Sequence, residues 1–397
     1  MPNQDHRPLS KISAYLSFPA IKSQNEWLDL LRSIAIILVI LRHGERAVPQ
    51  STEGEGALLH NLFTNGWVGV DLFLVLSGYL ITKSLLRAMS ERDFIAVGQY
   101  FQARAFRIIP AYYVVLFLVV LGAFPFYEAP AEITSDSILY HMFFLQDYLP
   151  SQINVVFWSL GVEEKFYILA PLIILLIMSF RKWQYSVLFL ASMLALSQVT
   201  KYMTFQSFSG EMPYQIFFET LRSPFHQVLE PLFIGVLIGF CEYKNLFKMS
   251  PRQAKTGLFT LGLITVAYLA TTDFHAKFTV LDSNVQPLIL STLFGAMVLC
   301  CLFLKSSKLK GTRIWRPIAR LSYSLYLVHF PLIPLAMVIA STTGSPWIAF
   351  WGYYILLSFL AASLLHFAVE KPFLNLKSRL LKPKTNDSPL NINKIPA

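Results

Sequence analysis

The residues of this sequence that could do chemistry are ionisable side chains that interrupt long apolar stretches. A charged group at membrane depth costs roughly 2.5–3.5 kcal/mol on insertion scales, so each one calls for an explanation. Arg32 and His43 lie eleven residues apart in the first apolar stretch. On a helix they would point the same way, about 16 Å apart along its axis. An imidazole titrates near neutrality and suits a general base, whereas a snorkelling arginine and an interfacial histidine are the structural alternative.

Two carboxylates, Asp71 and Glu163, stand near the starts of the second and fourth apolar stretches. Asp71 shares a helical stripe with Gly78, which would let a neighbouring helix approach closely. Its carboxylate could orient the His43 imidazole or simply cap its helix. Glu163 opens a run of three charged residues and lies one turn from Tyr167, on the same face. Such a run at the start of an apolar helix is hard to explain structurally, which favours a functional role for Glu163.

Two further groups of polar residues have helical spacing. Arg104 and Arg107 are three residues apart, hence on one face, just before the third apolar stretch. Guanidinium forks suit phosphate, while anchoring at the inner membrane face is the alternative. In the ninth stretch, Ser322, Tyr326 and His329 form a polar stripe that could line a cavity or join two helices.

Metal ligation and disulfides have little support in the sequence. His226 and Glu230 have a spacing that would suit a metal, but no third ligand is visible, so we expect no metal site. The three cysteines, Cys241, Cys300 and Cys301, lie in apolar runs and form no disulfide or metal-ligand pattern. We therefore expect them to be structural.

The elements that must position these groups are transmembrane helices. The chain is 55% hydrophobic and 14% charged, whereas a soluble domain averages about 25% charged residues. About 20 residues are needed to cross a bilayer. We expect an all-α, polytopic bundle of about ten transmembrane helices in a membrane domain over 27–373, between a segment 1–26 and a flexible tail 374–397. The ten stretches lie near 28–42, 67–86, 108–126, 160–180, 185–200, 225–241, 257–272, 286–304, 318–340 and 347–369.

The basic residues orient this bundle. The N-terminal segment, the even-numbered loops and the tail hold 26 Lys and Arg residues, and the odd-numbered loops hold 5. By the positive-inside rule both termini are cytoplasmic. The net charge of +10 then needs no nucleic-acid partner to explain it. The first 26 residues are polar and show no cleavable signal peptide, so the first helix is expected to insert as a signal anchor.

Six short motifs between Leu28 and Phe373, taken together and in their order along the chain, resemble those of the acyltransferase-3 family of integral membrane acyltransferases. Departures from the family pattern are Leu30 and Ser33, where Gly is frequent, and Lys165, where Gln is more usual. We expect no extracytoplasmic hydrolase-like domain of the kind found in some members, so the enzyme would complete the transfer alone or hand the acyl group to a partner. The motifs are Arg32 and His43 with ten residues between, Gly69-Val70-Asp71-Leu72-Phe73 with Ser77-Gly78, Arg104-x-x-Arg107-Ile108-x-Pro110, Trp158-Ser159-Leu160-x-x-Glu163, Ser322-Tyr323-Ser324-Leu325-Tyr326-Leu327-x-His329, and Glu370-x-Pro372-Phe373.

The resemblance implies a bacterial inner-membrane O-acetyltransferase without a permanently bound cofactor. It would move an acyl group, most often acetyl, from cytoplasmic acetyl-CoA to a hydroxyl of an extracytoplasmic carbohydrate such as lipopolysaccharide O-antigen. A transporter or flippase for a glycolipid or sugar is the alternative, but it predicts inverted repeats or broken helices in matched halves, and neither is visible.

The resemblance also implies roles for individual residues. Phosphates of the donor would be held by Arg32, Arg104 and Arg107. His43 would be the general base or a transient acyl carrier, oriented by Glu163 or Asp71. The acceptor or cavity would be lined by Trp158, Ser159, Tyr167, Tyr326 and His329. The route of the thioester requires Arg32 and His43 to line one passage through the bundle.

Overall fold

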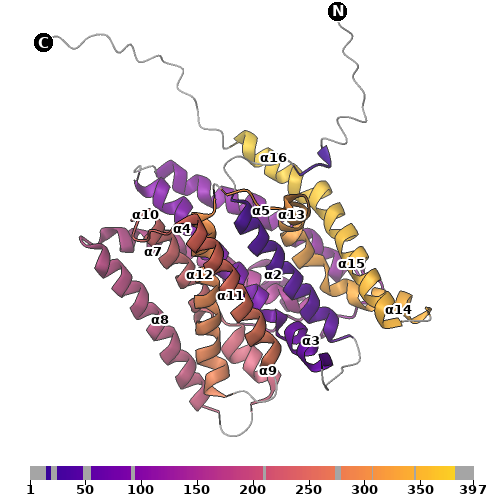
Figure 1. Cartoon of the computed structure of the whole chain (residues 1–397). Coiled ribbons are helices and arrows are strands. Elements are labelled where there is room, and N and C mark those ends of the chain that lie inside the picture. The colour runs from indigo at the N-terminus through magenta and orange to yellow at the C-terminus, as the bar shows by residue number, and fades with distance from the viewer. Residues whose placement is uncertain are drawn as a thin grey trace, which may run out of the picture.

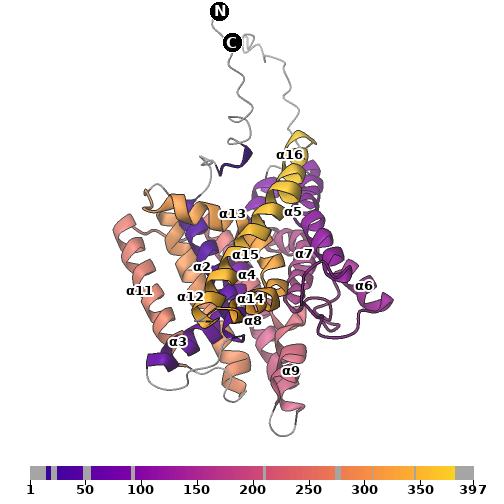
Figure 2. The same cartoon turned by 90° about the vertical axis from the view of Figure 1, so that its right-hand side faces the viewer.

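The computed structural model describes residues 15–18, 25–47, 55–90, 94–208, 212–272, 279–305, 307–343 and 346–380. These residues form helices and turns and contain no strand, which confirms the all-α prediction. The long helices lie side by side as a bundle (Figure 1; Figure 2). The α-helices are α2 (Glu26–Glu45), α3 (Glu55–Thr64), α4 (Val68–Ser90), α5 (Phe94–Val120), α6 (Ser135–Met142), α7 (Trp158–Ser179), α8 (Trp183–Gln206), α9 (Tyr214–Phe217), α10 (Leu229–Tyr243), α11 (Pro251–Thr271), α12 (Gln286–Phe303), α13 (Thr312–Val328), α14 (Ile333–Ser341), α15 (Pro346–Leu365) and α16 (Lys371–Leu380).

Short irregular helices join several of these elements. A π-helix inserts an extra residue into a helical turn and is frequent at functional sites. The π-helices are Phe218–Arg222, Leu281–Val285 and His366–Glu370, and the 3-10 helices are Asn65–Trp67, Val155–Phe157, Phe225–Gln227 and Phe330–Leu332.

In the described part of the chain, six helices are long and apolar enough to cross a membrane, or seven if the bent pair α13–α14 is one span. Each of the ten predicted stretches overlaps a helix. However, every 18-residue stretch of α2 and α7 contains more than two charged residues, and α10 has only 15 residues. The chemistry-bearing charges themselves thus keep α2 and α7 out of this set, and the count of ten stays a prediction. The six are Ala57–Met89, Val97–Val120, Trp183–Gln206, Pro251–Thr271, Leu281–Phe303 and Pro346–Leu380.

The ninth predicted span is not one straight helix. Its two halves, Thr312–Val328 and Phe330–Ser341, meet at 66°. Pro331 and Pro334 follow the break, and each removes a backbone donor and clashes with the preceding turn of a helix. The third span also ends earlier than predicted, at Val120, because Gly122 adopts a left-handed conformation (φ +66°) that closes the helix end.

The motif Glu370-x-Pro372-Phe373 does not end the last helix, although a proline inside a helix usually interrupts it. The π-helix His366–Glu370 leads directly into α16. Pro372 is tolerated there because the π-helix has already disrupted the regular hydrogen-bond ladder. Glu370 accepts hydrogen bonds from Ser324 (3.0 Å) and from Nδ1 of His366 (2.8 Å), so it joins the last helix to α13. The predicted tail from 374 begins inside α16, and residues 381–397 lie outside the described ones.

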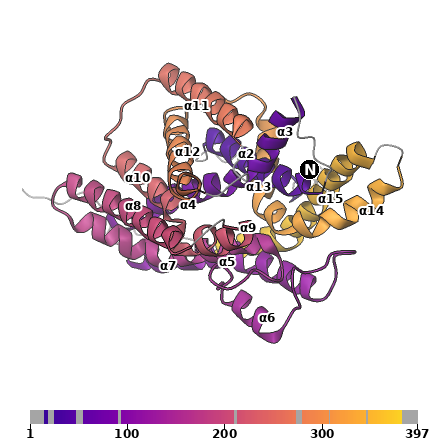
Figure 3. The ribbon, with the colours of Figure 1, turned by 90° about the horizontal axis from the view of Figure 1, so that it is seen from below.

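The centre of the bundle is formed by α2, α4 and α13 (Figure 3). Helices α4 and α10 cross at backbone contact, because a Cβ on Gly78 would lie 2.3 Å from the carbonyl oxygen of Leu232, and one on Gly235 would lie 2.3 Å from that of Val75. The predicted close approach at Gly78 is confirmed, and its partner is α10. This crossing fixes α4, which carries Asp71, against the rest of the bundle.

The bundle has two distinct ends. Tyr15 donates a hydrogen bond to the carbonyl oxygen of Phe367 (2.7 Å), and Lys371 of α16 donates one to the carbonyl oxygen of Ser17 (3.4 Å), so both ends of the described chain lie beside α16. Helices α3 and α9 lie at the opposite end (Figure 1). We call these the α16 end and the α9 end. The charge distribution predicts that the α16 end is cytoplasmic.

Candidate active site

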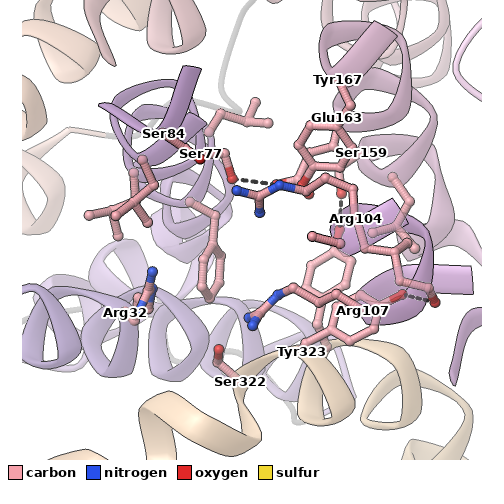
Figure 4. A pocket seen from close by; sticks show the side chains of 18 of the residues that line it. Arg32, Ser77, Ser84, Arg104, Arg107, Ser159, Glu163, Tyr167, Ser322 and Tyr323 are labelled. Atoms are coloured by element: carbon pink, nitrogen blue, oxygen red, sulfur yellow. Dashed lines mark hydrogen bonds between the residues drawn. The ribbon is translucent and has the colours of Figure 1, made fainter. Parts of the chain in front are cut away.

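A cavity of about 420 Å³ opens between α2, α4, α5, α7 and α13 toward the α16 end. We call it the donor-side cavity. Four cations line it, Arg32, Arg104, Arg107 and Lys377, together with one carboxylate, that of Glu163. The three guanidinium groups come from two helices and point into one space (Figure 4). The structure thus brings these three arginines together in one cavity, and their role in binding donor phosphates stays a prediction.

Glu163 lines the donor-side cavity, and both of its carboxylate oxygens accept hydrogen bonds. Its Oε1 accepts a hydrogen bond from Ser77 (3.0 Å), and its Oε2 accepts one from Tyr167 (2.7 Å), as the one-turn spacing predicts (Figure 4). The guanidinium of Arg104 lies over the rings of Tyr100 and Tyr167, 5.7 and 5.4 Å from their centroids. Glu163 thus hydrogen-bonds Ser77 and Tyr167 and has no hydrogen bond to His43, which corrects its expected role as the orienting group.

Asp71 also has a partner other than His43. Its carboxylate is wholly buried and lies 2.7 Å from the guanidinium of Arg222. That guanidinium is held between the indoles of Trp67 and Trp158, at 4.6 and 5.2 Å from the ring centroids. A buried ion pair of this kind positions its cation rigidly. The proposed orientation of the imidazole by Asp71 is therefore wrong, and Arg222 is a site residue that sequence reasoning counted only as a loop charge.

The group that contacts His43 is His329. Nδ1 of His329 lies 3.0 Å from the carbonyl oxygen of Leu325, which can only accept, so Nδ1 carries the proton. Nε2 of neutral His329 is then an acceptor, and it lies 3.1 Å from Nδ1 of His43. The same Nδ1 of His43 lies 2.9 Å from the carbonyl oxygen of Val39. With acceptors on both sides, Nδ1 of His43 is the protonated nitrogen, an assignment that follows from the hydrogen-bond network.

This tautomer leaves Nε2 of His43 with a lone pair. Within the described residues, that nitrogen has no hydrogen-bond partner. A histidine held as the Nδ1–H tautomer with a bare Nε2 is suited to take a proton from a hydroxyl. The arrangement resembles a nucleophile–base–orienter set in which a second imidazole replaces the usual carboxylate.

His43 lines a second, smaller cavity of about 70 Å³ toward the α9 end. We call it the acceptor-side cavity. Val70 and Tyr326 line both cavities, so the two spaces adjoin at these side chains. Tyr326 donates a hydrogen bond to the carbonyl oxygen of Val156 (2.7 Å) and lies 2.6 Å from Oγ of Ser159. The expected single passage from Arg32 to His43 is thus divided into two adjoining cavities, with Tyr326 between them.

The other predicted cavity residues are distributed over both cavities. Ser159, Tyr167 and Tyr326 line the donor-side cavity, and Trp158 lines the acceptor-side cavity. His329 lies against His43 rather than among the residues that line either one. The stripe of the ninth span therefore runs along the boundary of both spaces.

His226 and Glu230, which have metal-like spacing, bind different partners. His226 lies in a 3-10 turn with its Nδ1 3.0 Å from the hydroxyl of Tyr148, whereas Glu230 pairs with buried Lys201 (2.8 Å). Across the residues that the structure describes, no group of three His, Cys, Asp or Glu side chains could hold a metal ion.

Comparison with known proteins assigns the family. The acyltransferase-domain model of the acyltransferase-3 family matches residues 25–367. The chain is 28% identical over 342 residues to "Peptidoglycan O-acetyltransferase OatA" of Listeria monocytogenes, covering 80% of this chain and 50% of that protein. It is 26% identical over 370 residues to "Putative peptidoglycan O-acetyltransferase YrhL" of Bacillus subtilis, covering 87% of this chain and 54% of that protein.

The chain thus spans about half the length of these curated relatives. No solved structure gives a significant match. The match to the family model extends from the start of α2 into the last π-helix and includes the histidine pair and every residue that lines the two cavities except Lys377. The chain belongs to the acyltransferase-3 family of membrane acyltransferases.

Proposed function

We propose that this protein is an O-acetyltransferase that moves an acetyl group from cytoplasmic acetyl-CoA to a hydroxyl of a carbohydrate on the other side of the bacterial inner membrane. The observation that carries the proposal is the pair of adjoining cavities, one lined by three arginines and the other by an imidazole with a bare nitrogen. A charged nucleotide cannot cross a bilayer, but its uncharged pantetheine arm can extend between the two cavities.

The donor-side cavity suits the phosphates of CoA. Arg32, Arg104, Arg107 and Lys377 supply four cations there, and both carboxylate oxygens of Glu163 already accept hydrogen bonds. Guanidinium groups bind phosphate through paired hydrogen bonds, which supports a nucleotide rather than a neutral ligand. The predicted cytoplasmic location of the α16 end agrees with a cytoplasmic donor.

The transfer step uses the histidine pair. Nε2 of His43 takes the proton of the acceptor hydroxyl as the hydroxyl oxygen attacks the thioester carbonyl. The tetrahedral intermediate then expels the CoA thiolate, which receives that proton from His43. Nε2 of His329 accepts the Nδ1–H hydrogen bond throughout and stabilises the imidazolium. A transient acyl group on Nε2 of His43 would use the same nitrogen.

For the acceptor we propose a glycan of the cell envelope. The resemblance to the family implied a carbohydrate such as lipopolysaccharide O-antigen, whereas the two relatives are named for peptidoglycan. Both are polymers of sugar rings with free hydroxyls outside the inner membrane. To test the two acceptors, purified protein is supplied with labelled acetyl-CoA and either glycan, and the label transferred to the glycan is measured.

The decisive variant is His43→Ala. We expect it to abolish label transfer to the glycan, a loss of about 10²–10⁴-fold for a general base, while its amount in the membrane is unchanged. His226→Ala is the matched control, because this exposed histidine lines neither cavity. Full transfer by His43→Ala would remove the catalytic role, and an absence of transfer to every glycan by the wild type would refute the function.

A further inference from the structure

The acceptor-side cavity carries an excess of positive charge. Three arginines, Arg42, Arg46 and Arg222, line it together with one carboxylate, Asp282. Asp282 is already engaged, because its oxygens accept hydrogen bonds from the backbone and hydroxyl of Thr279 (2.8 and 2.7 Å) and from the amide of Gln286 (2.5 Å). It therefore fastens the start of a π-helix rather than neutralising the arginines.

Nearby acids do not remove this excess. Glu45 stands beside Arg46 in sequence, but its carboxylate binds Nδ1 of His60 (3.0 Å). Asp71 pairs with Arg222 but is not among the residues that line the cavity. One carboxylate, Asp282, thus lines the cavity against three arginines, and a cavity lined mainly by one sign of charge concentrates ligands of the other sign.

A tyrosine in the cavity responds to this positive field. Arg46 lies over the ring of Tyr214, 5.1 Å from its centroid. Burial raises the pKa of Tyr214, but the positive charges of Arg46 and Arg42 outweigh burial, and the pKa is lowered from its usual value. A field that favours the phenolate of Tyr214 also favours an anionic ligand at the same place.

The cavity wall is rigid and aromatic. The guanidinium of Arg222 lies between the indoles of Trp67 and Trp158, and Phe217 and Phe218 add further rings to the wall. A pre-oriented guanidinium loses little conformational freedom on binding an oxyanion. Flat rings around a small polar site are also the surface on which the faces of sugar rings pack. Two π-helices deliver Phe218, Arg222 and Asp282 to this wall.

The size of the cavity limits what it holds. About 70 Å³ has room for about five water molecules, at roughly 10–15 Å³ each on the same measure. This space suits one substituent rather than a whole ring. A small, rigid, cationic space beside the base matches a carboxylate or a phosphate group.

We propose that the acceptor-side cavity binds an oxyanion carried by the carbohydrate acceptor, so that the enzyme selects acidic glycans over neutral ones. This inference rests on the proposed function and names the substrate class of its site. The oxyanion is a carboxylate on a sugar ring or a phosphate on its anomeric carbon, and the two sources are separated by experiment.

Matched acceptors test the inference. The disaccharide of N-acetylglucosamine and N-acetylmuramic acid differs from di-N-acetylchitobiose by one lactyl ether, which places a carboxylate where one ring otherwise has its 3-hydroxyl. N-acetylglucosamine 1-phosphate differs from N-acetylglucosamine by one phosphate. We expect kcat/KM with acetyl-CoA to be about ten-fold higher for the acidic member of at least one pair, the gain of a charge-assisted hydrogen bond. The pair that shows the difference identifies the oxyanion. Equal kcat/KM within both pairs would overturn the proposal.

The variant Arg46→Gln connects the preference to the cavity. Arg46 is exposed, so its replacement does not disturb the core. We expect the ratio of kcat/KM between acidic and neutral acceptors to fall toward one. Arg313→Gln, which removes an exposed arginine that lines neither cavity, should leave the ratio unchanged. A ratio that Arg46→Gln does not alter would contradict the assignment.

Binding without transfer separates this inference from the proposed function. If no acceptor is acetylated, the proposed function fails, and the shift of the melting temperature by each compound still reports on the cavity. We expect N-acetylglucosamine 1-phosphate or the muramic disaccharide, but not its neutral counterpart, to raise the melting temperature of the wild type and not of Arg46→Gln. The absence of any such difference would overturn the inference.

Discussion

Nε2 of His329 lies 3.1 Å from Nδ1 of His43, and a backbone carbonyl fixes the tautomer of each ring. The base of this site is therefore oriented by a second imidazole on a different helix. Because that imidazole is uncharged, it adds no buried negative charge beside the three arginines of the acceptor-side cavity.

This geometry predicts the behaviour of His329 variants. We expect His329→Ala to lower kcat about ten- to a hundred-fold, the value of a hydrogen bond to a charged partner, and to leave KM for acetyl-CoA unchanged. The loss is smaller than for His43→Ala because the carbonyl oxygen of Val39 still holds Nδ1. His329→Gln, whose amide oxygen can accept the same hydrogen bond, should recover part of the rate. No difference between the two variants would contradict an orienting role.

The three arginines of the donor-side cavity predict a specific defect in donor binding. We expect Arg32→Gln, Arg104→Gln and Arg107→Gln each to raise KM for acetyl-CoA about ten-fold or more, because a charge-assisted contact to phosphate is lost. Steady-state kinetics with acetyl-dephospho-CoA refine the test. If a variant has the same KM as the wild type for this donor, which lacks the 3′-phosphate, the arginine that was replaced contacts the 3′-phosphate.

Arg313→Gln again serves as the control, since Arg313 lines neither cavity. Wild-type KM in all three cavity variants would place the donor elsewhere.

Asp71 is predicted to act on stability through Arg222. Removing one partner of a buried ion pair costs about 3–5 kcal/mol, because the other charge stays buried and unpaired. We expect Asp71→Asn to lower the melting temperature of the purified protein strongly. The double variant Asp71→Leu with Arg222→Leu should be less destabilised than the sum of the single variants, as a double-mutant cycle measures. An inactive Asp71→Asn with wild-type stability would instead return Asp71 to a direct role in the chemistry.

Sequence periodicity predicted relations within helices and failed for relations between them. Arg104 and Arg107 share a face, and Glu163 bonds Tyr167, because one helical turn fixes both pairs. The partner of His43 depends instead on how α2 packs against α13, which no local spacing encodes. The resemblance to a family indicated which residues matter, but the contacts between residues on different helices depend on how the helices pack.

Irregular helices account for other differences between the sequence-based predictions and the structure. Arg222 sits on a π-helix and pairs with Asp71 across 151 positions of the chain. A loop arginine in a sequence gives no signal of either feature. Equally, a proline usually interrupts a helix, but the chain continues as α16 at Pro372 because the π-helix before it has already disrupted the hydrogen-bond ladder.

The crossing of α4 and α10 gives a prediction about the scaffold that holds these groups. A Cβ on Gly78 would lie 2.3 Å from the backbone oxygen of Leu232, so Gly78→Ala must push two helices apart. Overpacking of this kind costs about 1–3 kcal/mol, and we expect a lower melting temperature and a lower kcat, since α4 carries Asp71 and Val70.

Gly262→Ala is the matched control in α11, where an added Cβ meets no heavy atom within 4 Å. There the helix propensity of alanine should stabilise the protein by up to about 1 kcal/mol. The two substitutions therefore have opposite expected signs, and thermal unfolding of both proteins in the same detergent measures them. Equal effects at Gly78 and Gly262 would mean that α4 and α10 do not cross at backbone contact.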